Sequence, residues 1–119
     1  MTRFCLLLTS PAFAHQSVAS ALQFATAAIS NGHQVTHIFL YEDGVYCALA
    51  DSDLPTDEPN LSQRLAQFCQ QQQIPLLYCV TAAEKRGVTD SVLAASHGYT
   101  AAGLAEFAMS LNDVKLVQF

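Results

Sequence analysis

Short apolar segments alternate with helix-like segments along this chain, and this order restricts the fold more than any other feature. The apolar segments that predict strands are residues 3–9, 35–41, 75–79 and 115–119. Segments with apolar residues at helical spacing lie between them, at residues 16–31, 61–73 and 100–111. Strand–helix alternation is typical of a parallel sheet, because each parallel connection has to cross back over the sheet. We therefore expect an α/β fold, a single domain over residues 1–119 whose open, mostly parallel sheet of about five strands is flanked by helices.

Two connecting segments have their own signals. Residues 45–49 follow the Asp43-Gly44 turn and are compatible with either a short strand or a helical turn. Residues 51–60 are acidic and contain Pro55 and Pro59, which predicts an exposed loop. No internal repeat, low-complexity tract or composition shift divides the chain.

The composition excludes two function classes. Only 13% of the 119 residues are charged against 51% hydrophobic, yet no apolar run reaches the roughly 18 residues that a membrane helix needs. We therefore expect no membrane span, and we assign the surplus apolar surface to subunit interfaces. The net charge is −5 and the five basic residues form no stripe, so the chain alone is a poor candidate for binding nucleic acid.

The amino-terminal residues imitate a secretory signal, with an apolar stretch followed by Ala12-Phe13-Ala14. That stretch, residues 4–8, is shorter than the usual apolar core of roughly 7–15 residues, so we expect a first strand and a cytoplasmic protein. Four cysteines show no C-x-x-C spacing, and cytoplasmic thiols normally stay reduced. We predict neither a zinc site nor a disulfide.

Cys79 is the strongest candidate for chemistry. It ends a predicted strand and precedes the helix-like segment Val80–Arg86, which Gly87 closes. The free N–H groups at the start of a helix favour an anion, so this thiol should ionise more readily than a free cysteine. Lys85 and Arg86 would add positive potential if they face the sulfur. The alternative interpretation is a small apolar residue that completes a buried strand.

The remaining candidates each keep two interpretations. Thr81 either hydrogen-bonds a sulfur anion or caps the helix, and Arg86 either stabilises the anion, contacts a partner or faces solvent. Glu42 and Asp43 could act as acid or base, or simply form a turn. Cys47 could be an accessory thiol near the same sheet edge or a packing residue, whereas Cys5 and Cys69 are predicted to lie in the core.

No cofactor or metal is predicted. The segment after the first strand, Thr9–Ala14, lacks the G-x-G-x-x-G pattern of a dinucleotide site. The four histidines, His15, His33, His37 and His97, form no ligand cluster in the sequence.

Several segments, in order, resemble the DsrE-type sulfur-relay family, and most closely its TusD-type subunits. The most specific is residues 79–88, which looks like the family's active-cysteine segment. The other segments are residues 9–13, Gln16, 20–25, 32–33, 39–46, 98–99, 103–104 and 117–119. The departures are Thr81 and Lys85 within the motif and a divergent stretch at residues 48–60, which lies at the predicted active edge.

The resemblance implies that Cys79 accepts a persulfide sulfur from a small carrier protein and passes it to an acceptor thiol. It also implies a heterohexamer with paralogous subunits that feeds 2-thiouridine synthesis in tRNA. One alternative is a related complex of dissimilatory sulfur oxidation. Others are a non-catalytic subunit in which Cys79 only packs, and a binding module for a small ligand at the sheet edge.

Overall fold

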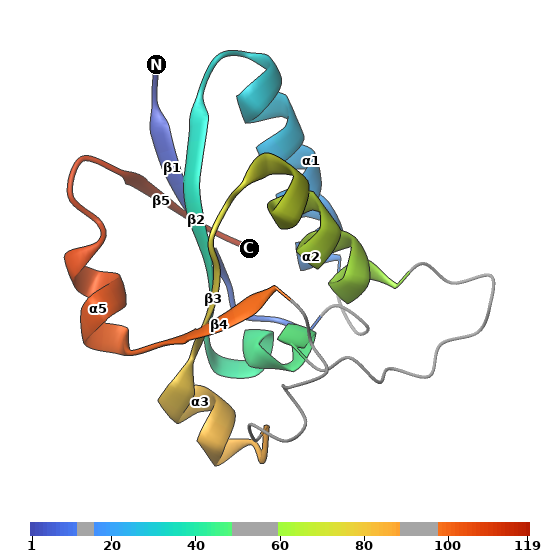
Figure 1. The fold of residues 1–119 in the computed structure, drawn as a ribbon, viewed down its shortest axis with the longest axis vertical. Coiled ribbons are helices and arrows are strands. Elements are labelled where there is room, and N and C mark those ends of the chain that lie inside the picture. Colours follow the sequence, from blue (N-terminus) through green and yellow to red (C-terminus); the bar gives the residue numbers. More distant parts are fainter. Residues whose placement is uncertain (12–15, 49–59, 89–97) are drawn as a thin grey trace.

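A single parallel sheet forms the centre of the protein in the computed structural model, which describes residues 1–11, 16–48, 60–88 and 98–119. The sheet has the strand order β4-β3-β2-β1-β5, and every neighbouring pair is parallel (Figure 1). Its strands are β1 (Arg3–Leu8), β2 (Gln34–Leu40), β3 (Leu76–Cys79), β4 (Tyr99–Ala102) and β5 (Lys115–Gln118). The expected α/β fold with about five parallel strands is confirmed.

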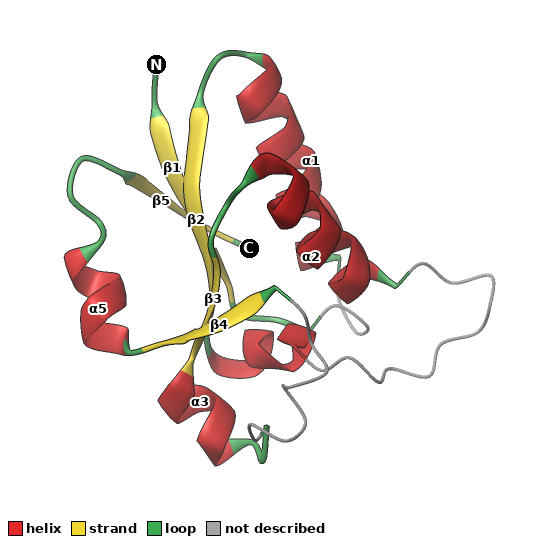
Figure 2. Cartoon of the chain, viewed as in Figure 1, coloured by secondary structure: helices red, strands yellow, loops and turns green. Residues whose placement is uncertain are grey.

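Helices cover the two faces of the sheet unequally. Helices α1 (Ser17–Ser30) and α2 (Leu61–Gln72) lie side by side on one face, and the short helix α5 (Leu104–Met109) lies against the other (Figure 2). Phe107 of α5 stacks on Phe39 of β2 with ring centroids 4.1 Å apart. Helix α3 (Val80–Lys85) continues directly from the end of β3.

The core lies between the sheet and the helix pair α1/α2, as the apolar pattern requires. Leu6 and Leu8 of β1 and Ile38 and Leu40 of β2 are at most 1% exposed. Asn60 is the N-cap residue directly before helix α2. Its side-chain oxygen accepts a hydrogen bond from the Gln63 amide at 3.0 Å. The predicted first strand is β1, an internal strand that pairs with β2 on one side and β5 on the other.

One predicted element is wrong in part. Residues 100–111 were expected to form a single helix, but Tyr99–Ala102 is the edge strand β4, and the helix covers only Leu104–Met109. The alanines of this segment have high helix propensity, yet parallel pairing with β3 outweighs that preference. Gly103 then separates the strand from the helix as the N-cap residue of α5.

The segment after β2 is the 3₁₀ helix η1 (Glu42–Ala48), which agrees with the helical-turn interpretation of residues 45–48. Residue 49 and nearly all of the predicted 51–60 loop lie outside the described residues. Among the helices of the described ranges, none has the length and apolar character of a membrane span.

Candidate active site

The candidate site lies at the carboxyl edge of the sheet, where β2 and β3 end. Cys79 is the last residue of β3, where it pairs with Ala102, and also the N-cap residue of α3. Tyr41 follows the end of β2, on the adjacent strand, and leads into η1. Ligands of open α/β sheets bind at this edge, because loops and helix starts gather there. The predicted strand-to-helix position of Cys79 is confirmed.

A pocket of about 350 Å³ is open to Cys79 although the residue itself is only 1% exposed. The lining residues come from η1 and its approach, from α3 and from α5: Tyr41, Glu42, Cys79, Thr81, Ala82, Lys85, Arg86 and Leu104. Cys79 thus belongs to the buried core and also lines this pocket.

The first turn of α3 immediately follows the thiol. The first N–H groups of any helix lack intrahelical acceptors, so they are available to an anion beside them. Within the described residues no side chain caps this helix, since Cys79 occupies the N-cap position without a side-chain hydrogen bond. Thr81 is the second residue of α3, not its cap, so the capping interpretation of Thr81 is wrong. Its side chain is exposed and lines the pocket.

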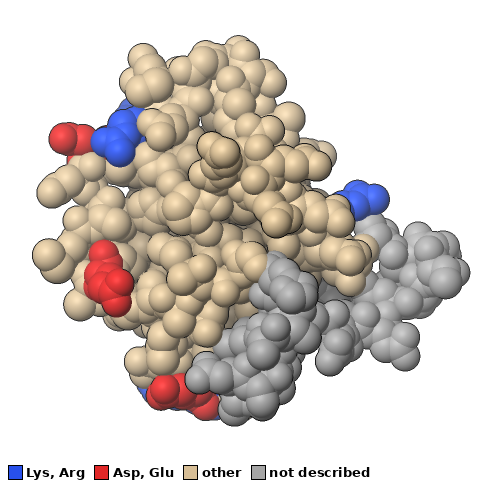
Figure 3. Space-filling model, viewed as in Figure 1, with Lys and Arg blue, Asp and Glu red and all other residues tan. Residues whose placement is uncertain are grey.

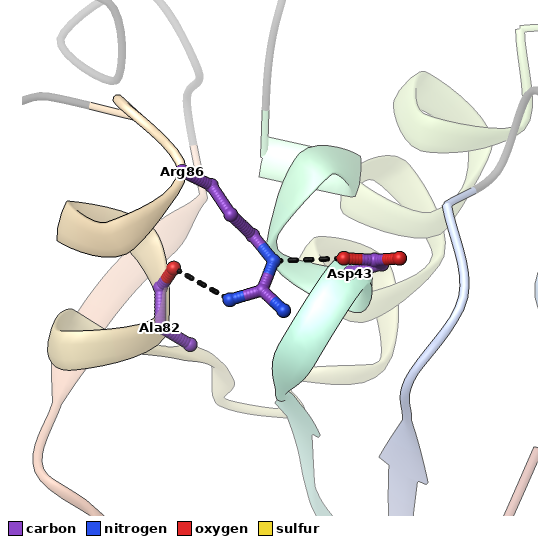
Figure 4. A network of polar contacts seen from close by, with 3 residues as sticks. All are labelled: Asp43, Ala82 and Arg86. Atoms are coloured by element: carbon purple, nitrogen blue, oxygen red, sulfur yellow. Dashed lines mark hydrogen bonds and ion pairs between the residues drawn. The ribbon is translucent and has the colours of Figure 1, made fainter.

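Arg86 connects α3 to η1. Its Nε donates to Oδ1 of Asp43 at 2.8 Å, and one terminal nitrogen, Nη1, donates to the Ala82 carbonyl at 3.1 Å (Figure 4). The hydrogen bond to Asp43 raises the pKa of Arg86, which keeps the guanidinium charged. Arg86 therefore contacts both η1 and α3 while its side chain stays partly exposed, and its proposed action on the sulfur anion stays a prediction.

Lys85 is the other cation of the pocket. Its side chain is exposed, and it forms no ion pair with any described residue.

The five basic residues are otherwise spread over the molecule, and Figure 3 shows only isolated basic side chains on the face in view. The predicted absence of a basic stripe is confirmed for that face.

The other cysteines have different surroundings. Cys47 is 1% exposed, its thiol lies 3.6 Å from the Ser10 carbonyl oxygen, and it does not line the pocket, which favours the packing interpretation. Burial raises the pKa of both Cys5 and Cys69 to about 12, so these thiols stay protonated and inert at neutral pH. All four cysteines belong to the buried core cluster, which for Cys5 and Cys69 is the predicted position.

The histidines lie away from the pocket or outside the described residues. His37 is buried and contacts Ser110 and Cys5 through Nε2 at 2.9 and 3.3 Å, while Nδ1 of His33 accepts the Thr2 amide. His15 and His97 fall outside the described residues. Among the residues that are described, no three His, Cys, Asp or Glu side chains could hold one metal ion.

Two pocket residues have no chemical signal in the sequence. Tyr41 was placed at the end of a predicted strand, which is the correct edge, but nothing marked its side chain as a pocket wall. Leu104 was placed inside a predicted helix, and its approach to the pocket depends on the parallel pairing of β4 with β3.

Comparison with known proteins finds relatives over nearly the whole chain. Three curated relatives, each named sulfurtransferase TusD, are similar over most of their length. The Serratia proteamaculans protein is 38% identical over 100% of both chains, and the Enterobacter protein is 36% identical over 98% of this chain and 99% of its own. The Erwinia tasmaniensis protein is 40% identical over 87% of this chain and 81% of its own.

The fold has a solved counterpart. The crystal structure of the ychN protein from E. coli superposes with a TM-score of 0.80 at 22% identity and covers 100% of both chains. The family model of the DsrE/DsrF-like family matches residues 2–119. The expected resemblance is therefore confirmed over nearly the entire sequence, and the chain belongs to the DsrE/DsrF-like family.

Proposed function

We propose that this protein transfers persulfide sulfur through Cys79. The chain is a sulfurtransferase, in keeping with its family and with the name of its relatives. The observation that carries the assignment to Cys79 is its place at the end of β3, directly before the first turn of α3 and open to a pocket. No other described cysteine lines that pocket.

Sulfur enters by attack of the Cys79 thiolate on the outer sulfur of a donor persulfide. A bond forms between the Cys79 sulfur and the transferred sulfur, the donor's S–S bond breaks, and the donor leaves as a thiolate. An acceptor thiolate then attacks the outer sulfur of the Cys79 persulfide and releases the Cys79 thiolate. Neither step changes the net oxidation state of the system, so no cofactor is required.

The pocket supplies a suitable environment for both steps. The N–H groups of the first turn of α3 lack intrahelical acceptors and can donate to a persulfide anion beside them, and we propose that the Thr81 hydroxyl donates a further hydrogen bond. Lys85 adds positive potential at the pocket rim. We propose that Arg86 supports the site through its hydrogen bonds to the Asp43 carboxylate and the Ala82 carbonyl.

The physiological setting follows the family resemblance. We propose a cytoplasmic heterohexamer of this DsrE-like domain with paralogous subunits. A small carrier protein donates the sulfur and a partner thiol accepts it, on the route to 2-thiouridine in tRNA. Contact with tRNA then belongs to other components, since this chain has a net charge of −5.

A persulfide donor labelled in its outer sulfur tests the assignment. After brief exposure and removal of donor, peptide mapping by mass spectrometry should place the label on Cys79. Cys47→Ser, the matched control, should load normally because Cys47 does not line the pocket. Cys79→Ser should carry no label, and label retained in that variant would refute the proposal.

Alkylation kinetics separate this function from a non-catalytic subunit. A thiol that only packs reacts slowly with iodoacetamide at neutral pH, whereas a stabilised thiolate reacts fast. We expect Cys79 to be modified first among the four cysteines of the folded protein. Modification of Cys79 only upon unfolding would support the purely structural role.

A further inference from the structure

Two walls of the pocket come from distant parts of the chain and are joined by one ion pair. Glu42 at the start of η1 lines one side, and Ala82 in the first turn of α3 lines another. Asp43 follows Glu42 directly, and its carboxylate accepts from Arg86, which is 43 residues further along the chain. Figure 4 shows this contact bridging η1 and α3.

The guanidinium of Arg86 contacts both walls at once. Nε is bound to Asp43, and Nη1 reaches back one turn to the carbonyl of Ala82. A planar guanidinium holds two such partners in a fixed relative geometry, which a flexible ammonium does not. The position of η1 is thereby tied to the helix that begins at Cys79.

The opposite side of η1 is fixed to the sheet. The Tyr41 amide donates to the Leu8 carbonyl at 2.9 Å, and the Gly44 amide donates to the Tyr41 carbonyl at 2.9 Å. A Cβ atom at Gly44 would lie only 2.0 Å from the Leu8 carbonyl oxygen, so the backbone of η1 packs directly on the end of β1. With one side held by β1, the ion pair joins the other side of η1 to the end of α3.

We propose that Asp43 and Arg86 form a positioning pair that holds the η1 wall against α3 and so sets the shape of the pocket around Cys79. Neither residue contacts the reacting sulfur in this role. The inference rests on the proposed function of Cys79, because it concerns the rate at which that thiol receives sulfur. It also assigns a function to Asp43, which the turn interpretation of Asp43-Gly44 did not include.

The exposure of the pair argues against a role in stability alone. The side chain of Arg86 is 25% exposed and that of Asp43 is 61% exposed. Ion pairs this open to solvent contribute little to folding free energy. Removal of the pair should therefore leave the protein folded while the pocket loses its fixed width.

A double-mutant cycle tests the proposal with Asp43→Asn, Arg86→Gln and the double variant. The rate of Cys79 sulfur loading is measured against the concentration of a small alkyl persulfide labelled in its outer sulfur. We expect each single variant to lower the maximal loading rate about two- to fivefold, the most that so exposed an ion pair can contribute, with half-saturation nearly unchanged. The double variant should be no slower than either single variant, because the two side chains act as one unit.

Three controls make the result decisive. Arg64→Gln removes an exposed arginine of α2 outside the pocket and should load at the parent rate. Thermal unfolding of each variant should occur near the parent temperature, and Asp43→Asn, which preserves side-chain size, decides the matter if Arg86→Gln is unstable. Arg86→Lys, which keeps the charge, should recover part of the rate.

The outcomes separate the two proposals. Parent-like loading in Asp43→Asn, or independent effects that multiply in the double variant, would overturn the positioning pair while Cys79 stays assigned. A raised half-saturation with an unchanged maximal rate would also overturn it, since that pattern indicates direct binding of the persulfide. Label retained in Cys79→Ser would instead overturn the underlying function.

Discussion

At the scale of single residues, four cysteines of one chain differ through their surroundings. Cys5 and Cys69 lie in the core, where burial raises the pKa of each thiol to about 12. Cys47 is buried beside the Ser10 carbonyl. Cys79 lines the pocket at the carboxyl edge of the sheet and directly precedes helix α3. Position in the fold, rather than residue type, is therefore the basis for proposing Cys79 as the thiol that exchanges sulfur.

The raised pKa of Cys5 and Cys69 predicts a loss of stability in alkali. The ordinary pKa of a cysteine thiol is 9.0, so well below pH 9 both thiols are protonated in the folded and in the unfolded protein. Between pH 9 and 12 the unfolded chain loses these protons first, so the free energy of unfolding falls, by up to about 1.4 kcal/mol per pH unit for each thiol.

Urea unfolding at several pH values measures this slope. Cys69→Ala removes one of the two groups and should give a shallower slope, whatever its effect on stability at pH 7. Burial also raises the pKa of Tyr99, whose hydroxyl donates to the Ser62 carbonyl, and this acts in the same direction. A slope unaffected by Cys69→Ala would show that its pKa is not raised by folding.

Thr81 provides a second prediction at this scale. Loss of its hydroxyl in Thr81→Val should slow sulfur loading of Cys79 about tenfold, the lower end of the effect of one hydrogen bond to a charged group. Thr81→Ser keeps the hydroxyl and should load at close to the parent rate. Because the side chain is exposed, neither change should alter thermal stability much. Equal loading in both variants would exclude the proposed hydrogen bond.

At the scale of elements, the close packing of η1 on β1 determines where the pocket wall stands. Gly44 is buried, and any side chain there would collide with the Leu8 carbonyl. Gly44→Ala should therefore destabilise the protein by about 1–3 kcal/mol, the usual cost of overpacking, and slow loading of Cys79 as η1 moves.

Gly103→Ala is the matched control for that substitution. An added Cβ at Gly103 meets only the Glu106 side chain, at 3.5 Å, which is ordinary contact. Its cost should stay below about 1 kcal/mol, the scale of a weakened N-cap. Denaturant unfolding of both variants checks the comparison, and equal stability of the two would contradict the close packing at Gly44.

Sequence patterns located the elements whose signal is local. Strand β2 follows from continuous apolar residues, and helix α2 from apolar residues at helical spacing. Cys79 was placed at the end of the next strand, directly before a helix, where the structure has it. Strand β4 was missed because its alanines favour a helix, and only its pairing with β3 makes it a strand. The Asp43–Arg86 contact joins residues 43 apart, so no local pattern could indicate it.

At the scale of the whole molecule, charge determines which partners the chain can bind alone. A net charge of −5 and the absence of a basic stripe leave little to offset the phosphates of RNA. We predict no binding of tRNA by the isolated chain at physiological salt, measured by fluorescence anisotropy with labelled tRNA. Salt-sensitive binding at micromolar protein would contradict this prediction and assign the chain a direct role at the RNA.

The most direct test of the account follows one sulfur atom through the protein. The chain is loaded with an outer-sulfur-labelled persulfide, freed of donor and then mixed with a small acceptor thiol. We predict that the label leaves Cys79 and appears on the acceptor while Cys79 returns to a thiol, at a rate that Cys47→Ser does not change. Label that never reaches Cys79, or that stays there after excess acceptor is added, would contradict the claim that Cys79 carries sulfur in transit.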